Sequence, residues 1–299
     1  MAYLDKGLTE LKESDMGKNV ALVLSSGSSR GLAHIGGIEA LENRGYTISS
    51  VAGCSMGSIV AGMFAAGKLP ELKAWFLDMT RRHMFELMDF TFTKNYLVKG
   101  EKLMKAIGDM IPDYQIENLN IPLSLVATDM NKGTEVVFRS GNLNRAIRAS
   151  FALPVLLQPV QENGMLLMDG GMCNPLPLNR VARREGDILA CVNVSGAYIT
   201  KPEEEKTPSW LETFIEKYAG SKLKPTEKQM SSIAILDRCS DIMIQQNSEL
   251  MKQLCPPDIC VDIAMNQFGS FEYDNAEEII RFGYDKMMAQ IDEYEKKQG

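Results

Sequence analysis

The sequence lacks several features that mark other classes of protein. Its 299 residues hold 32 Lys and Arg against 39 Asp and Glu, and this formal net charge of -7 leaves no positive excess to bind nucleic acid or anionic lipid. The longest apolar run, residues 59–66, is far short of the ~20 residues that span a bilayer. Residues 1–18 lack the apolar centre of a secretory leader. We expect a soluble, cytoplasmic protein that contacts a membrane or micelle surface only transiently.

Metal-binding patterns are also missing. The six cysteines form no Cys-x-x-Cys pair, and only two histidines, His34 and His83, are available as further ligands. We therefore expect reduced thiols, no metal and no cofactor. With 45% hydrophobic and 24% charged residues, the chain has the composition of a globular protein that buries a sizeable core.

The first part of the chain predicts two strand–helix units. Residues 19–24 form an apolar run that stops at a Ser- and Gly-rich loop, and apolar residues then recur at helical spacing up to Gly45. Residues 48–52 read as a second strand, followed by a sharp turn and a helix over 58–66. Two such units with short loops indicate an α/β fold with a mostly parallel sheet.

The rest of the chain continues this pattern as one domain, residues 19–299, after an N-terminal extension, residues 1–18. A charged segment, residues 201–229, has an apolar stripe at 210–218 and looks like an inserted, lid-like helix. The other predicted elements are a hairpin of 122–129 and 134–138, helices at 143–150 and 178–184, strands at 165–169 and 188–194, and a C-terminal helix introduced by the capping-box pair Asp274 and Glu277.

One pentapeptide has the pattern of a nucleophile elbow. Gly-Cys-Ser-Met-Gly at 53–57 places Ser55 between a predicted strand and a predicted helix, where glycines two positions away on each side allow close backbone packing. Ser55 would then lie at a helix N-terminus, which stabilises negative charge. The pattern alone also fits a turn of small residues with no catalytic role.

A nucleophilic serine needs a base. No histidine follows residue 83, so the chain order of an α/β-hydrolase triad is excluded. Asp169 ends an apolar strand and precedes two glycines, which puts it at the edge where open parallel sheets build their sites. Partial burial would raise its pKa and make it a better base, whereas a turn aspartate without catalytic function is the simpler alternative.

A third element is the loop of residues 25–31. Its backbone amides, with the helix that follows, can form a nest for the oxyanion of an acyl-transfer intermediate. Arg30 either braces this loop or binds a substrate phosphate.

These motifs together resemble the patatin-like phospholipase family over roughly residues 19–195. The resemblance implies a Ser-Asp dyad on a three-layer α/β/α sandwich with lipid acyl hydrolase activity, in which Ser55 is the nucleophile, Asp169 the base, and the amides of Gly27, Ser28 and Ser29 the oxyanion donors. His34 matches a position where the family often has histidine, with a structural role. The blocks that carry the resemblance are residues 26–31, 32–36, 53–57, 149–154, 169–171 and 174–177.

The glycine-rich loop departs from the family pattern. Ser26 and Ser28 replace the first and third glycines of Gly-Gly-Gly-x-Arg-Gly. If either position needs a positive φ, serine costs on the order of 1 kcal/mol and misaims the amides. Alternatively, a serine hydroxyl adds a hydrogen-bond donor. Cys54, beside the nucleophile, either packs or is open to oxidation, and packing is the usual state of a free cysteine.

An unusual density of Met and aromatic residues occupies 75–97. We hypothesise that this cluster, with Phe85, Met88 and Phe90, lines an apolar channel for the acyl chain, although ordinary core packing explains it equally simply. The sequence thus predicts a serine hydrolase of lipid or small esters. A thioesterase or transacylase, and a catalytically silent lipid-binding protein, remain alternatives, and the oligomeric state, including a homodimer, stays open.

Overall fold

A twisted central sheet organises the molecule. The computed structural model describes residues 18–87, 89, 98–154, 156–199, 232–269 and 272–298. In this part of the chain the strand order is β5-β6-β3-β2-β1-β7-β8, with β4 paired to β3. The strands are β1 (Asn19–Leu24), β2 (Thr47–Cys54), β3 (Leu123–Asp129), β4 (Thr134–Phe138), β5 (Val160–Glu162), β6 (Met165–Asp169), β7 (Ile188–Gly196) and β8 (Ile259–Ala264).

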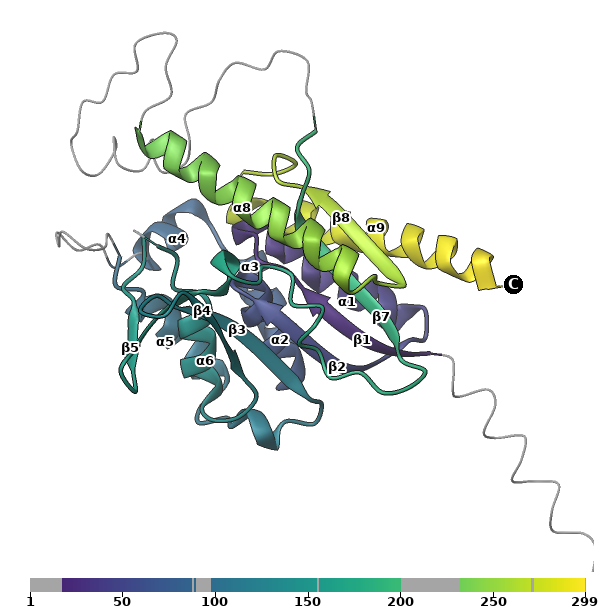
Figure 1. Ribbon diagram of the computed structural model, residues 1–299, viewed down its shortest axis with the longest axis horizontal. Helices are drawn as coiled ribbons and strands as arrows, with labels where there is room; N and C mark the ends of the chain where they lie inside the picture. The colour runs from purple at the N-terminus through teal and green to yellow at the C-terminus, as the bar shows by residue number, and fades with distance from the viewer. Residues whose placement is uncertain are drawn as a thin grey trace, which may run out of the picture.

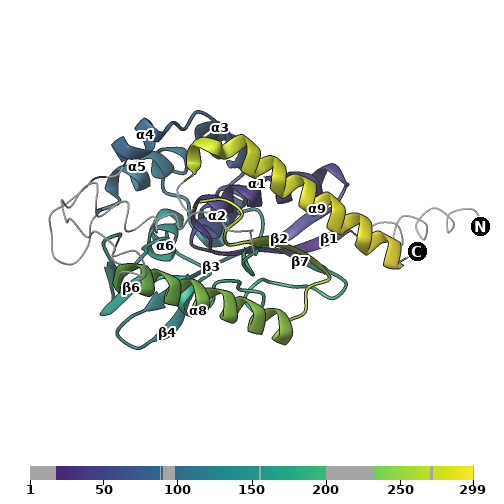
Figure 2. The ribbon, with the colours of Figure 1, turned by 90° about the horizontal axis from the view of Figure 1, so that it is seen from above.

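Helices cover both faces of this sheet. Viewed from above, α1, α2 and α9 lie on one side and α8 lies along the other, so the predicted three-layer α/β/α sandwich is confirmed (Figure 1 and Figure 2). The helices are α1 (Ala33–Asn43), α2 (Met56–Ala65), α3 (Leu69–Leu77), α4 (Arg81–Leu87), α5 (Glu101–Met110), α6 (Leu143–Ser150), α8 (Ser232–Leu254) and α9 (Ala276–Gln298), with 3-10 turns η1 (Ser28–Leu32), η2 (Ile116–Asn118), η3 (Gly170–Met172) and η4 (Tyr273–Asn275).

The alternation of side chains along β1 divides the core into two. Val20, Leu22 and Leu24 point into the large core beneath α1, α2 and α9. Ala21 and Val23 point to the opposite face, into a smaller core shared with α8. Because successive residues of a strand face opposite sides, a continuous apolar run is what a strand buried on both faces requires.

Strand direction changes across the sheet. Strands β2, β1, β7 and the edge strand β8 are parallel, and β3 is parallel to β2, as the strand–helix units predicted. At the other edge, β4 and β6 are both antiparallel to β3, and β5 is antiparallel to β6. The sheet is therefore mostly parallel with an antiparallel edge.

Most predicted elements are confirmed, including the helix at 143–150 and the C-terminal helix, while the helix predicted at 178–184 is wrong. That stretch consists of turns, with hydrogen bonds from Leu178 N–H to the Leu176 carbonyl and from Arg180 N–H to the Pro177 carbonyl. Leu176 and Leu178 are buried in the smaller core, and this burial with the neighbouring prolines overrides helical spacing. The inserted segment, residues 201–229, lies outside the described residues, as does nearly all of the N-terminal extension.

Within the described ranges, every helix is too short or too polar to cross a lipid bilayer.

Helices α1 and α9 pack at unusually close range. An added Cβ at Gly36 would collide with the Ile280 carbonyl and lie 2.6 Å from the Tyr284 nitrogen. On the opposing helix, a Cβ at Gly283 would collide with the Ala33 carbonyl. Glycine on both helices therefore sets their separation, which in turn positions the loop that precedes α1.

We expect Gly36→Ala to destabilise the protein by about 3 kcal/mol, because its Cβ meets backbone atoms that cannot move aside. Gly37→Ala is the matched control, because it makes the same change one position along α1. Its Cβ meets a Val192 methyl group at 2.8 Å and no backbone atom, so we expect a smaller loss of stability. Urea unfolding of both variants measures the difference. Equal losses of stability would contradict this account of the helix contact.

Candidate active site

Ser55 lies in a strained turn between β2 and α2. Its φ of 55° and ψ of -122° are rarely adopted by a residue with a side chain, and such a conformation costs about 1–3 kcal/mol. The flanking glycines make the turn sterically feasible: a Cβ at Gly53 would lie 2.6 Å from the Gly57 carbonyl carbon, and a Cβ at Gly57 would lie 2.6 Å from the Ser25 carbonyl oxygen. The predicted strand–turn–helix context of Ser55 is confirmed.

Two neighbouring serines hold this turn. The Ser55 N–H donates to Ser150 Oγ at 3.0 Å, and Ser150 Oγ donates to the Val126 carbonyl at 2.6 Å. Ser58 Oγ donates to the Ser55 carbonyl at 2.6 Å. Sequence reasoning gave Ser150 no role. Ser150 does fall within the block 149–154 that carries the family resemblance, and this was the signal that could have singled it out.

Asp169 lies at the end of strand β6, at the antiparallel edge of the sheet. Strand β3 continues beyond the end of β2: Cys54 is opposite Val126, and on the same side of β3 the next residue, Ala127, is opposite Asp169, while β4 occupies the other side. Asp169 ends strand β6, as the sequence predicted, but β6 is antiparallel to β3 and not part of the parallel sheet. The extra length of β3 gives β6 a partner along which it runs back toward the end of β2, so Asp169 still arrives beside Ser55.

Asp169 is held rigidly and is only 3% exposed. Its N–H donates to the Ala152 carbonyl at 2.9 Å, and its own carbonyl accepts from Thr128 Oγ1 at 2.9 Å. Its Oδ1 accepts from the Gly171 N–H at 2.7 Å, whereas Oδ2 has no hydrogen-bond partner among the described residues. One carboxylate oxygen is thus fixed and the other remains available.

Burial raises the pKa of Asp169 to about 6, against an ordinary 3.8. The Ser55 hydroxyl and the Gly171 N–H both oppose this rise. The Ser55 side chain therefore lies close enough to interact with the carboxyl, although no hydrogen bond of ordinary geometry joins the two. A carboxyl with a pKa near neutrality is ionised at pH 7 yet basic enough to accept a proton.

The loop before α1 crosses the same end of the sheet. Gly27 precedes η1 and packs so tightly that an added Cβ would collide with the Val194 side chain. Ser28 has a φ of 51°, so the cost expected for a serine in the left-handed region applies at this position. Ser29 is buried, and its Oγ donates to the Gly269 carbonyl at 2.6 Å. The role of these three amides as oxyanion donors stays a prediction.

Arg30 and His34 brace this loop from within. Arg30 is 5% exposed, and its Nε donates to the Val194 carbonyl at 3.1 Å. His34 is fully buried, and its Nε2 donates to the Ser25 carbonyl at 2.9 Å. Burial lowers the pKa of His34 to about 4, so the ring is neutral at pH 7. This geometry favours a bracing role for Arg30, while its predicted contact with substrate remains untested.

Cys54 is also fully buried. Its Sγ lies 3.0 Å from the position that a Cβ on Gly170 would occupy, and burial raises its pKa well above the ordinary value. A buried neutral thiol is a poor target for oxidation, which favours the packing interpretation.

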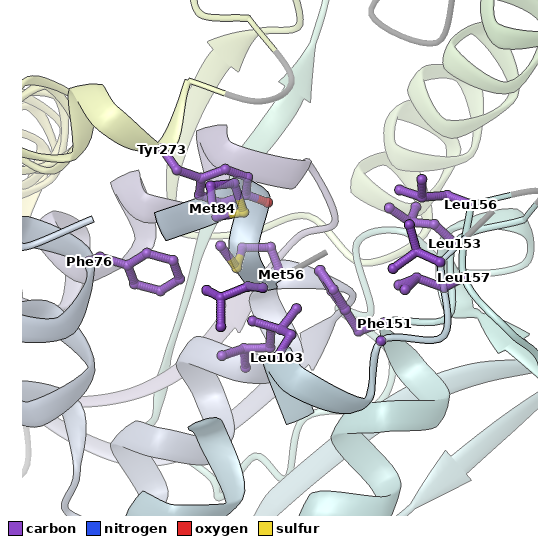
Figure 3. Close-up of a pocket in the computed structure, with 13 residues that line it drawn as sticks. Met56, Phe76, Met84, Leu103, Phe151, Leu153, Leu156, Leu157 and Tyr273 are labelled. Carbon is purple, nitrogen blue, oxygen red and sulfur yellow. The ribbon is translucent and has the colours of Figure 1, made fainter. Parts of the chain in front are cut away.

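An apolar cavity adjoins the turn that carries Ser55 (Figure 3). Met56, the residue after Ser55, forms part of its wall, and the cavity volume is about 50 Å³. Phe76 and Met84 come from the Met and aromatic cluster of the sequence, whereas the Phe85 side chain, Met88 and Phe90 lie outside the described structure. The lining residues are Met56, Ile59, Phe76, Met84, Leu87, Val98, Gly100, Leu103, Phe151, Leu153, Leu156, Leu157 and Tyr273.

Fold and site together define a class: a three-layer α/β protein that presents a serine on a strained strand–helix turn beside a buried carboxyl. The family model of the patatin-like phospholipases matches residues 22–182. This chain belongs to the patatin-like phospholipase family.

The chain matches only part of the length of each curated relative. An uncharacterized NTE family protein of Mycobacterium tuberculosis is 40% identical over 199 residues, which are 66% of this chain and 55% of that protein. The lysophospholipase NTE1 of Kluyveromyces lactis is 31% identical over 200 residues, 64% of this chain and 13% of that protein. Among solved structures, VipD from Legionella pneumophila superposes with a TM-score of 0.49 and 16% identity, covering 94% of this chain and 67% of that one.

The raised pKa of Asp169 predicts the effect of its replacement on stability. Because the folded pKa of about 6 exceeds the ordinary 3.8, the folded protein binds the proton more tightly than the unfolded chain. The stabilisation is therefore present below about pH 4 and is lost as the pH rises through 6. We expect Asp169→Asn, which stays neutral, to be more stable than the wild type at pH 8 by up to about 3 kcal/mol, with a difference that vanishes near pH 4.

Thermal unfolding between pH 4 and pH 8 measures this crossover. The matched control is Asp129→Asn, a buried aspartate whose Oδ1 accepts from the Asn131 N–H at 3.0 Å and which we expect to give no gain. A loss of stability in Asp169→Asn at pH 8 would contradict the burial of an unfavourable charge.

Proposed function

We propose that this protein is a serine acyl hydrolase that cleaves carboxylic esters of lipids, with Ser55 as nucleophile and Asp169 as base. The observation that carries the proposal is the pairing of a serine in a strained, glycine-flanked turn with a buried carboxyl whose pKa is raised to about 6. Family membership supports the same chemistry. Neither histidine has a comparable position: His34 is neutral and bonded to the Ser25 carbonyl, and His83 is exposed on α4.

In the acylation step, Asp169 accepts the Ser55 proton while Oγ attacks the ester carbonyl. The developing oxyanion is stabilised by the amides of Gly27, Ser28 and Ser29. Collapse of the intermediate breaks the bond to the alcohol, which takes the proton from Asp169. The leaving alcohol and an ester between Ser55 and the acyl group are the products of this step.

In the deacylation step, Asp169 accepts a proton from water, whose oxygen attacks the acyl group. The second tetrahedral intermediate expels Ser55, which recovers its proton from Asp169, and a carboxylic acid is released. Both steps need only one carboxylate. The rigid backbone hydrogen bonds of Asp169 keep its free Oδ2 available for each transfer.

The apolar cavity supports a hydrocarbon acyl group as substrate. Its lining carries no charged side chain among the described residues, and Met56 links it directly to Ser55. A site of about 10–15 Å³ holds one water-sized group, so a cavity of about 50 Å³ accepts several methylene groups. Entry of a chain from a lipid aggregate would require transient contact with the lipid surface, and we propose such contact.

We also propose a cytoplasmic location. Six cysteines in 299 residues do not give the high cysteine density of a secreted protein that disulfides stabilise. This fits a reducing compartment.

Hydrolysis of p-nitrophenyl esters and phospholipids by wild type, Ser55→Ala and Asp169→Asn tests the proposal. We expect both variants to lose at least about a thousandfold in kcat/KM. Labelling by a fluorophosphonate probe should require Ser55. A folded wild-type protein that the probe leaves unlabelled would instead favour the catalytically silent alternative, and preferred turnover of thioesters would favour a thioesterase.

Asp169 must be ionised to act as a base, and this predicts the pH dependence. With a folded pKa of about 6, kcat/KM should rise about tenfold per pH unit below pH 6 and level off above pH 7. The rate of fluorophosphonate labelling should show the same pH dependence, because labelling requires the same base. A profile that is flat from pH 5 to pH 8 would exclude Asp169 as the group that activates Ser55.

A further inference from the structure

Ser26 is a buried serine beside Asp169 that the proposed mechanism does not use. It is 4% exposed, and its Oγ has no hydrogen-bond partner among the described residues. Burying a hydroxyl without a hydrogen-bond partner is unfavourable, because the group gives up its hydrogen bonds to water. Such an atom therefore calls for an explanation, and its position at the candidate active site suggests one.

The backbone of Ser26 fixes where its side chain points. Its N–H donates to the Pro175 carbonyl at 2.9 Å, and its carbonyl accepts from Ser195 Oγ at 2.8 Å and from Ser25 Oγ at 3.0 Å. Every polar group of its backbone is thus occupied by protein. Only the side-chain hydroxyl remains, and it lies against Gly171.

Two side-chain oxygens lie together beside Gly171. A Cβ on this glycine would lie 3.0 Å from Asp169 Oδ1 and 3.3 Å from Ser26 Oγ. The carboxylate and the hydroxyl therefore both lie beside Gly171, on the side where any other residue would carry its side chain. The unpartnered Asp169 Oδ2 belongs to the same carboxylate. Oxygens arranged in this way fit one small molecule with two hydrogens to donate.

We propose that Ser26 and Asp169 together hold the water that hydrolyses the acyl-enzyme, which makes Ser26 a positioning residue for deacylation. This inference rests on the proposed function. The water donates one hydrogen to Asp169 and the other to Ser26 Oγ, and its lone pair faces the acyl carbonyl. When the C–O bond forms, its first proton passes to Asp169; collapse then breaks the bond to Ser55, which takes that proton back, and the acid leaves with the other hydrogen.

Acylation involves no water, so the two half-reactions should respond differently to Ser26→Ala. We expect the rate of fluorophosphonate labelling to stay within about twofold of wild type, while turnover of p-nitrophenyl butyrate falls at least about tenfold. Intact-mass spectrometry should then detect a butyryl-enzyme at steady state. In added methanol, the ratio of methyl ester to free acid should rise, because water loses its second contact and methanol has only one hydrogen to donate.

Two further variants control for structural damage. Ser248→Ala removes another buried hydroxyl, one that bonds only to the Ile244 carbonyl within α8, and should leave both half-reactions and the methanol ratio unchanged. Ser26→Gly removes the same hydroxyl and should reproduce Ser26→Ala, which guards against an effect of the alanine methyl group. A thermal unfolding temperature close to that of wild type establishes that each variant is folded.

The outcomes separate the two proposals. Equal slowing of labelling and turnover, no change in either, or an unchanged methanol ratio would overturn the role of Ser26 while leaving the Ser55 mechanism in place. Labelling and turnover that persist in Ser55→Ala would overturn the proposed function itself, and the role of Ser26 with it.

Discussion

Close backbone packing at the ends of β1 and β2 is the constraint on which the site depends. Gly57 brings the first turn of α2 against the carbonyls of Leu24 and Ser25, and Gly53 brings β2 against the same turn. Any side chain at either glycine would push the helix away. The strained backbone of Ser55 exists because these contacts leave it no other path, and the strain is distributed over a buried, fully packed region.

The buried carboxyl of Asp169 destabilises the fold in addition to the strained backbone of Ser55. A charge at a nearly inaccessible position is destabilising, and only the Gly171 N–H and the Ser55 hydroxyl oppose its cost. The apolar burial in the large core under α1, α2 and α9 offsets both the strain at Ser55 and the buried charge of Asp169. The tight contact between α1 and α9 also supports the site, because it fixes α1 and the loop with Gly27 leads directly into that helix. Stability is thus concentrated on the face that supports the strained elements.

Local patterns predicted the parts of the site that depend on local structure. The strand, turn and helix around Ser55 follow from an apolar run, two glycines and helical spacing, and all of these lie within about twenty residues. The direction of β6 could not be predicted in this way, because a five-residue apolar strand has no polarity relative to a partner forty residues away. The same limit explains Ser150, which reaches the Ser55 amide only through tertiary packing.

The cavity illustrates a different limit. Its aromatic and Met residues were visible as a dense cluster, but Leu153, Leu156 and Leu157 lie on either side of Pro154, in a stretch for which the sequence predicted no helix or strand. The helix predicted near 178–184 failed for a related reason, since the helical spacing of Leu178 and Val181 also arises where turns place apolar side chains in a core. Apolar spacing reports burial, and the element that achieves it depends on the neighbours.

Because β6 pairs with β3, the distance between the Ser55 hydroxyl and the Asp169 carboxyl can change only in steps of whole residues. A strand can shift along its partner only by whole residues, and each single step turns every side chain to the opposite face of the sheet. Asp169 therefore either faces the end of β2 or is absent from it, with no intermediate alignment. Changes in the lengths of the loops around this edge therefore leave the alignment of the two groups intact as long as Asp169 stays opposite Ala127.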